Sequence, residues 1–145
     1  MKVDHRQDIL IATVGDTAVT RDWYALMHPL LMQNYAPVGD LVGETAPARP
    51  TPARALADYV GTYDSPYFGP ARISQGENGL VLTLGPAAIT MPMTHWDGDV
   101  FSIAPRSENA PYGSLSSVRF ERLGGALKSM RIDYLNDEGL ATWTR

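Results

Sequence analysis

The chain has 145 residues, enough for one domain with a hydrophobic core, and its 44% apolar and 19% charged residues are typical of a globular protein. Its net charge of −4 argues against nucleic acid or an anionic membrane as the main partner. There is no cysteine, which excludes disulfides and thiolate chemistry. We find neither a signal peptide nor an apolar run long enough to span a bilayer, so we predict no membrane partner and leave the location open.

The first 42 residues contain one strand pattern and one helix pattern. Residues 9–14 (ILIATV) are apolar on both faces, which is typical of a strand covered on both sides of its sheet. Thr20 is a suitable helix cap, and a break is expected at Pro29. Apolar residues at helical spacing follow the cap: Trp23, Leu26, Met27, Leu30 and Leu31. Because these two pieces cannot form a core alone, we expect a second subunit or domain to cover them, and we predict a homo-oligomer.

A proline-rich stretch, residues 43–54, separates this segment from the rest of the chain. Pro47, Pro50 and Pro52 make it extended and semi-rigid, as expected of a linker. We therefore predict three parts: a strand-helix segment (residues 1–42), a linker (residues 43–54) and a folded domain (residues 55–145).

The predicted domain contains about eight short strands separated by Gly, Asn and Asp turns. The turn at residues 77–79 predicts a hairpin between residues 71–75 and 80–84. Residues 89–96 are the next strand candidate, but Pro92 cannot donate a hydrogen bond to a sheet and so marks an edge or a bulge. Evenly spaced turns favour an antiparallel meander. We predict a mainly β fold, an antiparallel barrel of about eight strands with an N-terminal strand and helix, and keep a two-sheet sandwich as the alternative.

Several short motifs follow one another in this domain: YVGTY (residues 59–63), YFGP (67–70), GLVL (79–82), HW (95–96), DVF (99–101) and VRF (118–120). With them, residues 55–145 resemble the C-terminal lipocalin-like domain of many serine β-lactamase-like and penicillin-binding-protein-like hydrolases. Residues 61–63 (GTY) are similar to the Gly-x-Trp start of lipocalins, with Tyr in place of Trp. Residues 1–42 resemble the last strand and C-terminal helix of the hydrolase domain. The resemblance implies an accessory domain of usually unknown function, in a family that is often periplasmic or extracellular.

The catalytic residues of such a hydrolase are missing from the chain. A β-lactamase-like enzyme needs Ser-x-x-Lys, in which the lysine activates the serine. The lysines are Lys2 and Lys128, and neither follows a serine by three positions. Residues 112–114 (YGS) are similar to the Tyr-x-Asn/Ser element of the family, but they fall in a predicted barrel loop. We therefore predict no enzymatic activity, no catalytic residue and no cofactor.

His95, Asp97 and Asp99 lie close together in the sequence and are candidates for metal ligands or an acid-base pair. A metal site needs three or four converging ligands. Nothing else in the sequence points to such a site, so we interpret His95 as a hydrogen-bonded strand-end residue and the aspartates as turn residues. We predict no metal site.

Aromatic side chains and one histidine are the candidate ligand-binding residues at a barrel mouth: Tyr63, Tyr67, Phe68, His95 and Trp96. Small eight-stranded barrels are often filled by their own side chains. We therefore expect a packed interior, in which Val118 and Phe120 point inward and Arg119 points outward.

The function predicted is that of a non-catalytic accessory domain of a β-lactamase-like serine hydrolase. It would shape the substrate cleft or drive oligomerisation, with the catalytic domain or another copy of the chain as its partner. The alternative is a free-standing calycin-like binder of small apolar ligands, which requires a cavity of roughly 300 Å³ or more.

Overall fold

The structure, a computed structural model, describes residues 36–106 and 110–145. Within the chain, Pro37–Arg145 group together as one compact unit. The strand predicted at residues 9–14 and the helix predicted after Thr20 lie outside the described residues.

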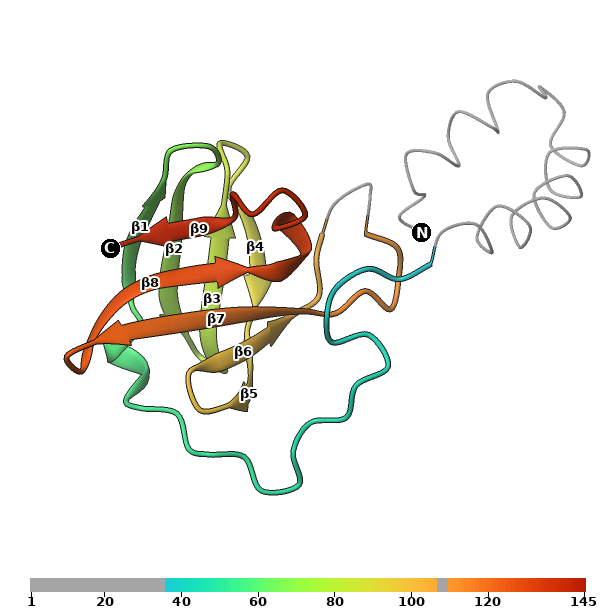
Figure 1. Cartoon of the computed structure of the whole chain (residues 1–145), viewed down its shortest axis with the longest axis horizontal. Helices are drawn as coiled ribbons and strands as arrows, with labels where there is room; N and C mark the ends of the chain where they lie inside the picture. The colour runs from blue at the N-terminus through green and yellow to red at the C-terminus, as the bar shows by residue number, and fades with distance from the viewer. Residues whose placement is uncertain (1–35, 107–109) are drawn as a thin grey trace, which may run out of the picture. The chain divides into compact units, whose positions relative to one another are not determined.

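Within the described residues, nine antiparallel strands form one sheet in the order β4-β3-β2-β1-β9-β8-β7-β6-β5 (Figure 1). The strands are β1 (Gly61–Ser65), β2 (Gly69–Gly76), β3 (Gly79–Leu84), β4 (Ile89–Pro92), β5 (Thr94–Asp97), β6 (Val100–Ile103), β7 (Ser116–Leu123), β8 (Ala126–Ile132) and β9 (Thr142–Thr144). Short 3-10 helices, η1 (Leu56–Asp58) and η2 (Asp133–Leu135), precede β1 and β9. No helix in this part of the chain combines the length and the hydropathy needed to cross a membrane.

The two edges of the sheet are joined by the chain itself, which makes the sheet a nearly closed barrel. β4 pairs with β3 and β5 pairs with β6, and only Met93 separates β4 from β5. The Met93 N–H donates to the carbonyl of Leu80 at 2.9 Å. The mainly β, antiparallel barrel predicted from the sequence is confirmed. The predicted strand at residues 89–96 is divided at Met93, just after Pro92, because it changes partner there, and this division contributes to the count of nine strands instead of about eight.

Local alternation and turn chemistry place the strands as predicted. β2 and β3 form the expected hairpin, with Ala71 opposite Leu84 and Gly76 opposite Gly79. Gly79 has φ +127°, a conformation that residues with a side chain rarely adopt. In β7, Val118 and Phe120 are buried and Arg119 is partly exposed, which confirms the predicted orientation.

The interior of the barrel is filled by side chains. Four aromatic rings, those of Tyr59, Tyr63, Phe101 and Phe120, contact one another with centroids 5.0–6.0 Å apart. The other large, fully buried side chains of the core are Trp143, Ile73, Leu80, Leu82, Met91, Ile103, Met130, Ile132 and Val118. Burying one such side chain stabilises a fold by about 1.5–3 kcal/mol, so this core is the main source of stability.

The segment that precedes the first strand of the barrel is hydrogen-bonded to the barrel at several points. The Asp40 carboxylate accepts hydrogen bonds from the backbone N–H of Ser117 at 2.7 Å, from the Ser117 hydroxyl at 2.6 Å and from Arg119 at 2.9 Å. Gly39 must be glycine, because an added Cβ would lie 2.1 Å from the carbonyl oxygen of Leu115. Within the predicted linker, the Thr51 N–H donates to Asp97 at 2.6 Å. The division of the chain at residues 42 and 54 stays a prediction.

Candidate functional site

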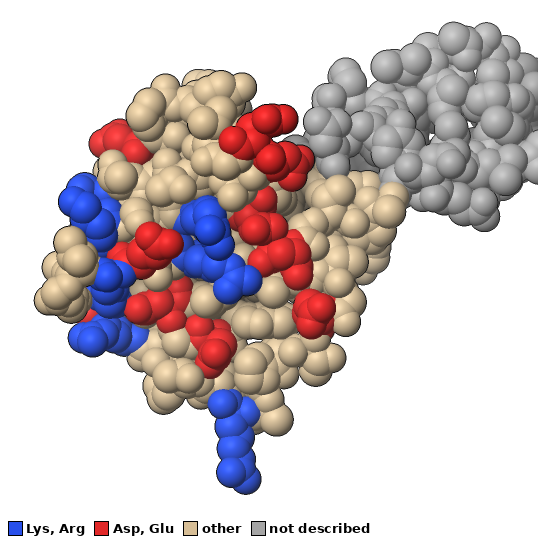
Figure 2. Space-filling model, viewed as in Figure 1, with Lys and Arg blue, Asp and Glu red and all other residues tan. Residues whose placement is uncertain are grey.

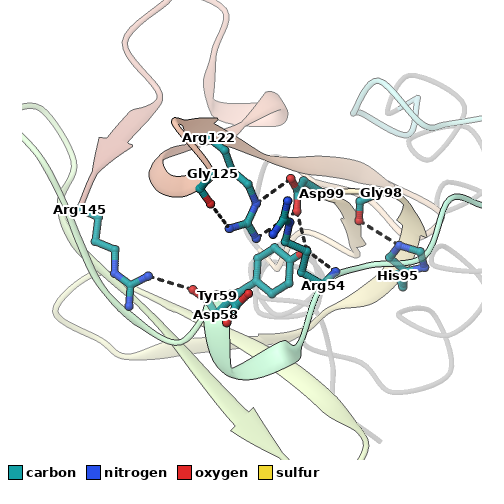
Figure 3. Close-up of polar contacts among 9 residues, drawn as sticks. All are labelled: Arg54, Asp58, Tyr59, His95, Gly98, Asp99, Arg122, Gly125 and Arg145. Atoms are coloured by element: carbon teal, nitrogen blue, oxygen red, sulfur yellow. Dashed lines mark hydrogen bonds and ion pairs between the residues drawn. The ribbon is translucent and has the colours of Figure 1, made fainter.

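A polar network ties the start of β1 to the neighbouring turns (Figure 3). Tyr59, just after η1, donates its hydroxyl to the Asp99 carboxylate at 2.5 Å and accepts the backbone N–H of Arg54 at 3.1 Å. Arg122 of β7 binds both oxygens of Asp99, at 2.9 and 3.2 Å, and donates to the carbonyl of Gly125 at 3.3 Å. The Arg122 guanidinium also lies 5.2 Å from the centre of the Tyr59 ring. One aspartate in the β5–β6 turn therefore holds η1 and β7 together.

The electrostatics of this network follow from these contacts. Burial acts to raise the pKa of Asp99, but the hydrogen bonds from Arg122 and Tyr59 outweigh it and hold that pKa below the usual 3.8. The hydrogen bond to Asp99 raises the pKa of Arg122. Burial, followed by the hydrogen bond to Asp99, raises the pKa of Tyr59. Asp99 is thus ionised and Tyr59 neutral at pH 7, the pair of states that the observed hydrogen bonds require.

A second arginine closes the same end of the barrel. The Arg145 guanidinium donates to the carbonyls of Asp58 at 2.9 Å and Val60 at 2.8 Å, and it lies 5.8 Å from the centre of the Tyr63 ring. A Cβ at Gly61 would come within 3.2 Å of this guanidinium. Both arginines are engaged by groups of their own chain, so we interpret this end, here called the tied end (Tyr59, Asp99, Arg122 and Arg145), as a structural closure.

The three candidate metal ligands have separate partners. The Nε2 atom of His95 is 3.1 Å from the carbonyl oxygen of Gly98, and its ring lies against Phe101 at 5.4 Å. Asp97 accepts from Thr51, and Asp99 belongs to the tied end. Over residues 36–106 and 110–145, no group of three or more His, Cys, Asp or Glu side chains is arranged to hold a metal ion.

The serine of the YGS element also has a structural role. Ser114 is buried, and its hydroxyl oxygen accepts the backbone N–H of Val38 at 3.0 Å. Tyr112 of the same element is 99% exposed. The serine therefore helps to hold the incoming segment on the barrel.

The five candidate ligand residues are not brought together at one mouth. Tyr63 is fully buried in the core, His95 packs on Phe101, and Trp96 is half-buried on β5. Tyr67 and Phe68 are in contact with each other, with ring centroids 4.8 Å apart. These two form part of a surface at the far end of β1.

Phe68 stacks on Trp143 of β9, with centroids 5.3 Å and planes 24° apart, and the Trp143 indole N–H donates to the carbonyl of Gly69 at 2.9 Å. Trp143 is not among the site residues predicted from the sequence. Its alternation with two threonines in residues 142–144 signals an inward side chain, but nothing in the sequence pairs it with Phe68.

Three segments meet at this end of the barrel, as Figure 1 shows. β2 begins where β3 finishes, so the β1–β2 turn lies beside the β3–β4 turn. The Phe68–Trp143 stack places β9 beside the β1–β2 turn, and Leu140 lies in the segment just before β9. We call these residues, 65–70, 85–89 and Leu140, the apolar end. None of them is charged, and the surface here is tan in Figure 2, with acidic side chains beside it.

Comparisons with known proteins agree with the fold. A family model described as "Domain of unknown function (DUF3471)" matches residues 45–141. A comparison with curated proteins found no match. Among solved structures, the chain is similar to the C-terminal domain of penicillin binding protein Rv0907, with 39% sequence identity and a TM-score of 0.63, over 76% of this chain and 99% of that chain. The resemblance of residues 55–145 is therefore confirmed, and the chain belongs to the DUF3471 family as an accessory, C-terminal-type domain of a penicillin-binding-protein-like protein.

Proposed function

We propose that the chain is a non-catalytic accessory domain of a β-lactamase-like serine hydrolase, and that it packs against the catalytic domain and shapes its substrate cleft. The observation that carries the proposal is the 39% identity to the C-terminal domain of a penicillin-binding protein over nearly all of that domain. At this identity the fold is expected to be shared.

The bound segment at the start of the barrel supports a positioning role. Asp40, Leu41 and Thr51 all hydrogen-bond to the barrel, and Leu41 is only 5% exposed. A domain carried on a free tether would sample many orientations. The entry segment is attached to the barrel at two places, near Asp40 and at Thr51, which supports a restricted orientation of the barrel towards its partner, as shaping a cleft requires.

The alternative of a small-ligand binder receives no such support. It needs an internal cavity of roughly 300 Å³ or more. The centre of this barrel instead contains Tyr59, Tyr63, Phe101, Phe120 and Trp143, all buried against one another or against the rest of the core.

Adding the full chain to a separately produced catalytic domain tests the proposal. The catalytic domain should contain Ser-x-x-Lys and come from a penicillin-binding-protein-like hydrolase of the same source. We expect a one-to-one complex by calorimetry and a severalfold change in KM for a chromogenic ester. The chain alone, and its Ser114→Ala variant, should hydrolyse nothing. Absence of a complex together with unchanged kinetics would contradict the proposal.

The predicted homo-oligomer remains a separate proposal. Its motivation lies in residues 1–42, so it does not depend on the barrel. Light scattering on the full chain measures the oligomeric state directly, and a monomer at all accessible concentrations would exclude it.

A further inference from the structure

The apolar end carries large side chains that the fold does not bury. Tyr67 is 70% exposed, Leu140 48% and Ile89 41%. They are contributed by the β1–β2 turn, the segment before β9 and the start of β4, and so gather from three parts of the sequence. Single exposed apolar residues are common, but a group on one uncharged surface is typical of a contact site.

The exposed Tyr67 is held in place by its contact with Phe68, which packs on the core. Phe68 contacts it edge-on, at 4.8 Å and 78°, and Phe68 in turn is stacked on the buried Trp143. The hydroxyl of Ser65, itself buried, accepts the Phe68 N–H at 3.3 Å and so secures the turn. A tyrosine braced in this way loses little conformational entropy on binding, which favours it as an interface anchor.

We infer that the apolar end is a docking surface for a folded protein, with Tyr67 as its anchor, and that the matching surface presents an apolar pocket flanked by Lys or Arg. The inference rests on the proposed function, because it takes the catalytic domain of the serine hydrolase as that partner.

The charged residues next to the apolar end along the chain are mostly acidic, which favours a partner with basic side chains. Asp64, Asp137 and Glu138 are exposed and lie within three positions of its segments, where Arg72 is the single basic residue. None of these three carboxylates forms an ion pair with another described residue. Basic side chains on a partner would complement them, increasing the association rate and excluding wrong partners.

The same charges argue against two other occupants. A second copy docked through this end about a two-fold axis would bring the three carboxylates of one copy towards those of the other. An anionic lipid surface would be repelled in the same way. A protein with an apolar centre and a basic rim meets neither obstacle.

The test measures binding of the full chain to the catalytic domain by calorimetry, comparing Tyr67→Ala with Tyr112→Ala. Tyr112 is a matched control, because it is a 99% exposed tyrosine on the loop before β7. We expect Tyr67→Ala to weaken binding at least about 30-fold, and Tyr112→Ala to change it less than about twofold. Asp137→Lys should also weaken binding and reduce its dependence on salt. Thermal unfolding of each variant checks that the barrel is intact.

The outcomes separate the two proposals. If the wild-type chain binds the catalytic domain and Tyr67→Ala binds equally well, the docking surface is wrong and the proposed function stands. If the wild-type chain binds no such domain, the proposed function fails and the inference fails with it. Light scattering and sedimentation with phosphatidylglycerol vesicles complete the test. Self-association or vesicle binding that Tyr67→Ala abolishes would overturn the assignment of the partner.

Discussion

The side chains at one end of β1 have hydrogen-bond partners within the chain, whereas at the other end a large apolar side chain is left exposed. At the tied end, Asp99 and the two arginines Arg122 and Arg145 all have hydrogen-bond partners within the chain. At the apolar end, a stacked pair of rings supports a tyrosine that is mostly exposed. Polar groups that are already hydrogen-bonded within the chain contribute little to binding a partner. Covering exposed apolar area, in contrast, lowers the free energy and so favours binding. The difference indicates that one end closes the barrel and the other is available for contact.

The largest expected effect on the free energy of unfolding is at Trp143, the buried residue that supports the apolar end. Trp143→Ala should lower the free energy of unfolding by about 3–5 kcal/mol, because it removes a buried ring and leaves a cavity under Phe68. Urea unfolding followed by far-UV circular dichroism measures the change. A loss below about 1 kcal/mol would mean that Trp143 does not brace this end, and the contrast between the ends would lose its basis.

A smaller effect is expected at the tied end. Asp99→Ala leaves the Arg122 guanidinium and the Tyr59 hydroxyl without their shared acceptor. Because the Asp99 side chain is 30% exposed, the loss should be about 1–2 kcal/mol, less than for a fully buried pair. Asp64→Ala is the control, since this aspartate is exposed on β1 and should change stability by less than about 0.5 kcal/mol. Equal effects of the two substitutions in urea unfolding would remove the structural role of the network.

The pH dependence of stability should depend on Asp99 of the tied end and on two further aspartates, Asp40 and Asp133. The pKa of Asp99 is lower in the fold, as is that of Asp40, where hydrogen bonds from Ser117 and Arg119 outweigh the effect of burial. A lowered pKa stabilises the fold above the unfolded value of about 3.9, and this contribution is lost as the pH falls through the folded values. Asp133 acts in the opposite direction, because burial raises its pKa and its ionisation costs stability at neutral pH.

We therefore expect urea midpoints to fall steeply below about pH 4 for the wild type and less steeply for Asp99→Asn. Asp133→Asn should raise the midpoint at neutral pH and make the fall towards acid steeper. An equally steep fall for the wild type and for Asp99→Asn would contradict the ionised state assigned to Asp99.

The smallest expected effect on stability is at the anchor itself. Tyr67→Ala should change the free energy of unfolding by less than about 0.5 kcal/mol, because most of the side chain is exposed. Measuring Tyr67→Ala and Trp143→Ala in the same urea series compares an exposed and a buried aromatic residue within the apolar end. A loss as large as that of Trp143→Ala would show that Tyr67 is part of the core and would count against its role as an anchor.

Much of the barrel was predictable because its strands follow local rules. Alternation determined that Val118 and Phe120 point inward, and the Asn78-Gly79 turn determined the β2–β3 hairpin. These features depend on neighbours a few residues away, where side-chain period and turn chemistry are sufficient. The absence of Ser-x-x-Lys, and the family resemblance, were likewise evident from the residues.

The sites were decided by contacts between distant residues. Tyr59 meets Asp99 forty positions later, and Phe68 meets Trp143 across seventy-five. No local pattern specifies these pairs, since they depend on which strands the barrel brings together and on where the chain divides at Met93. For the same reason the five aromatic and histidine candidates looked alike in the sequence. Only the tertiary structure showed that Tyr63 fills the core while Tyr67 is exposed, because burial depends on the packing of all nine described strands at once.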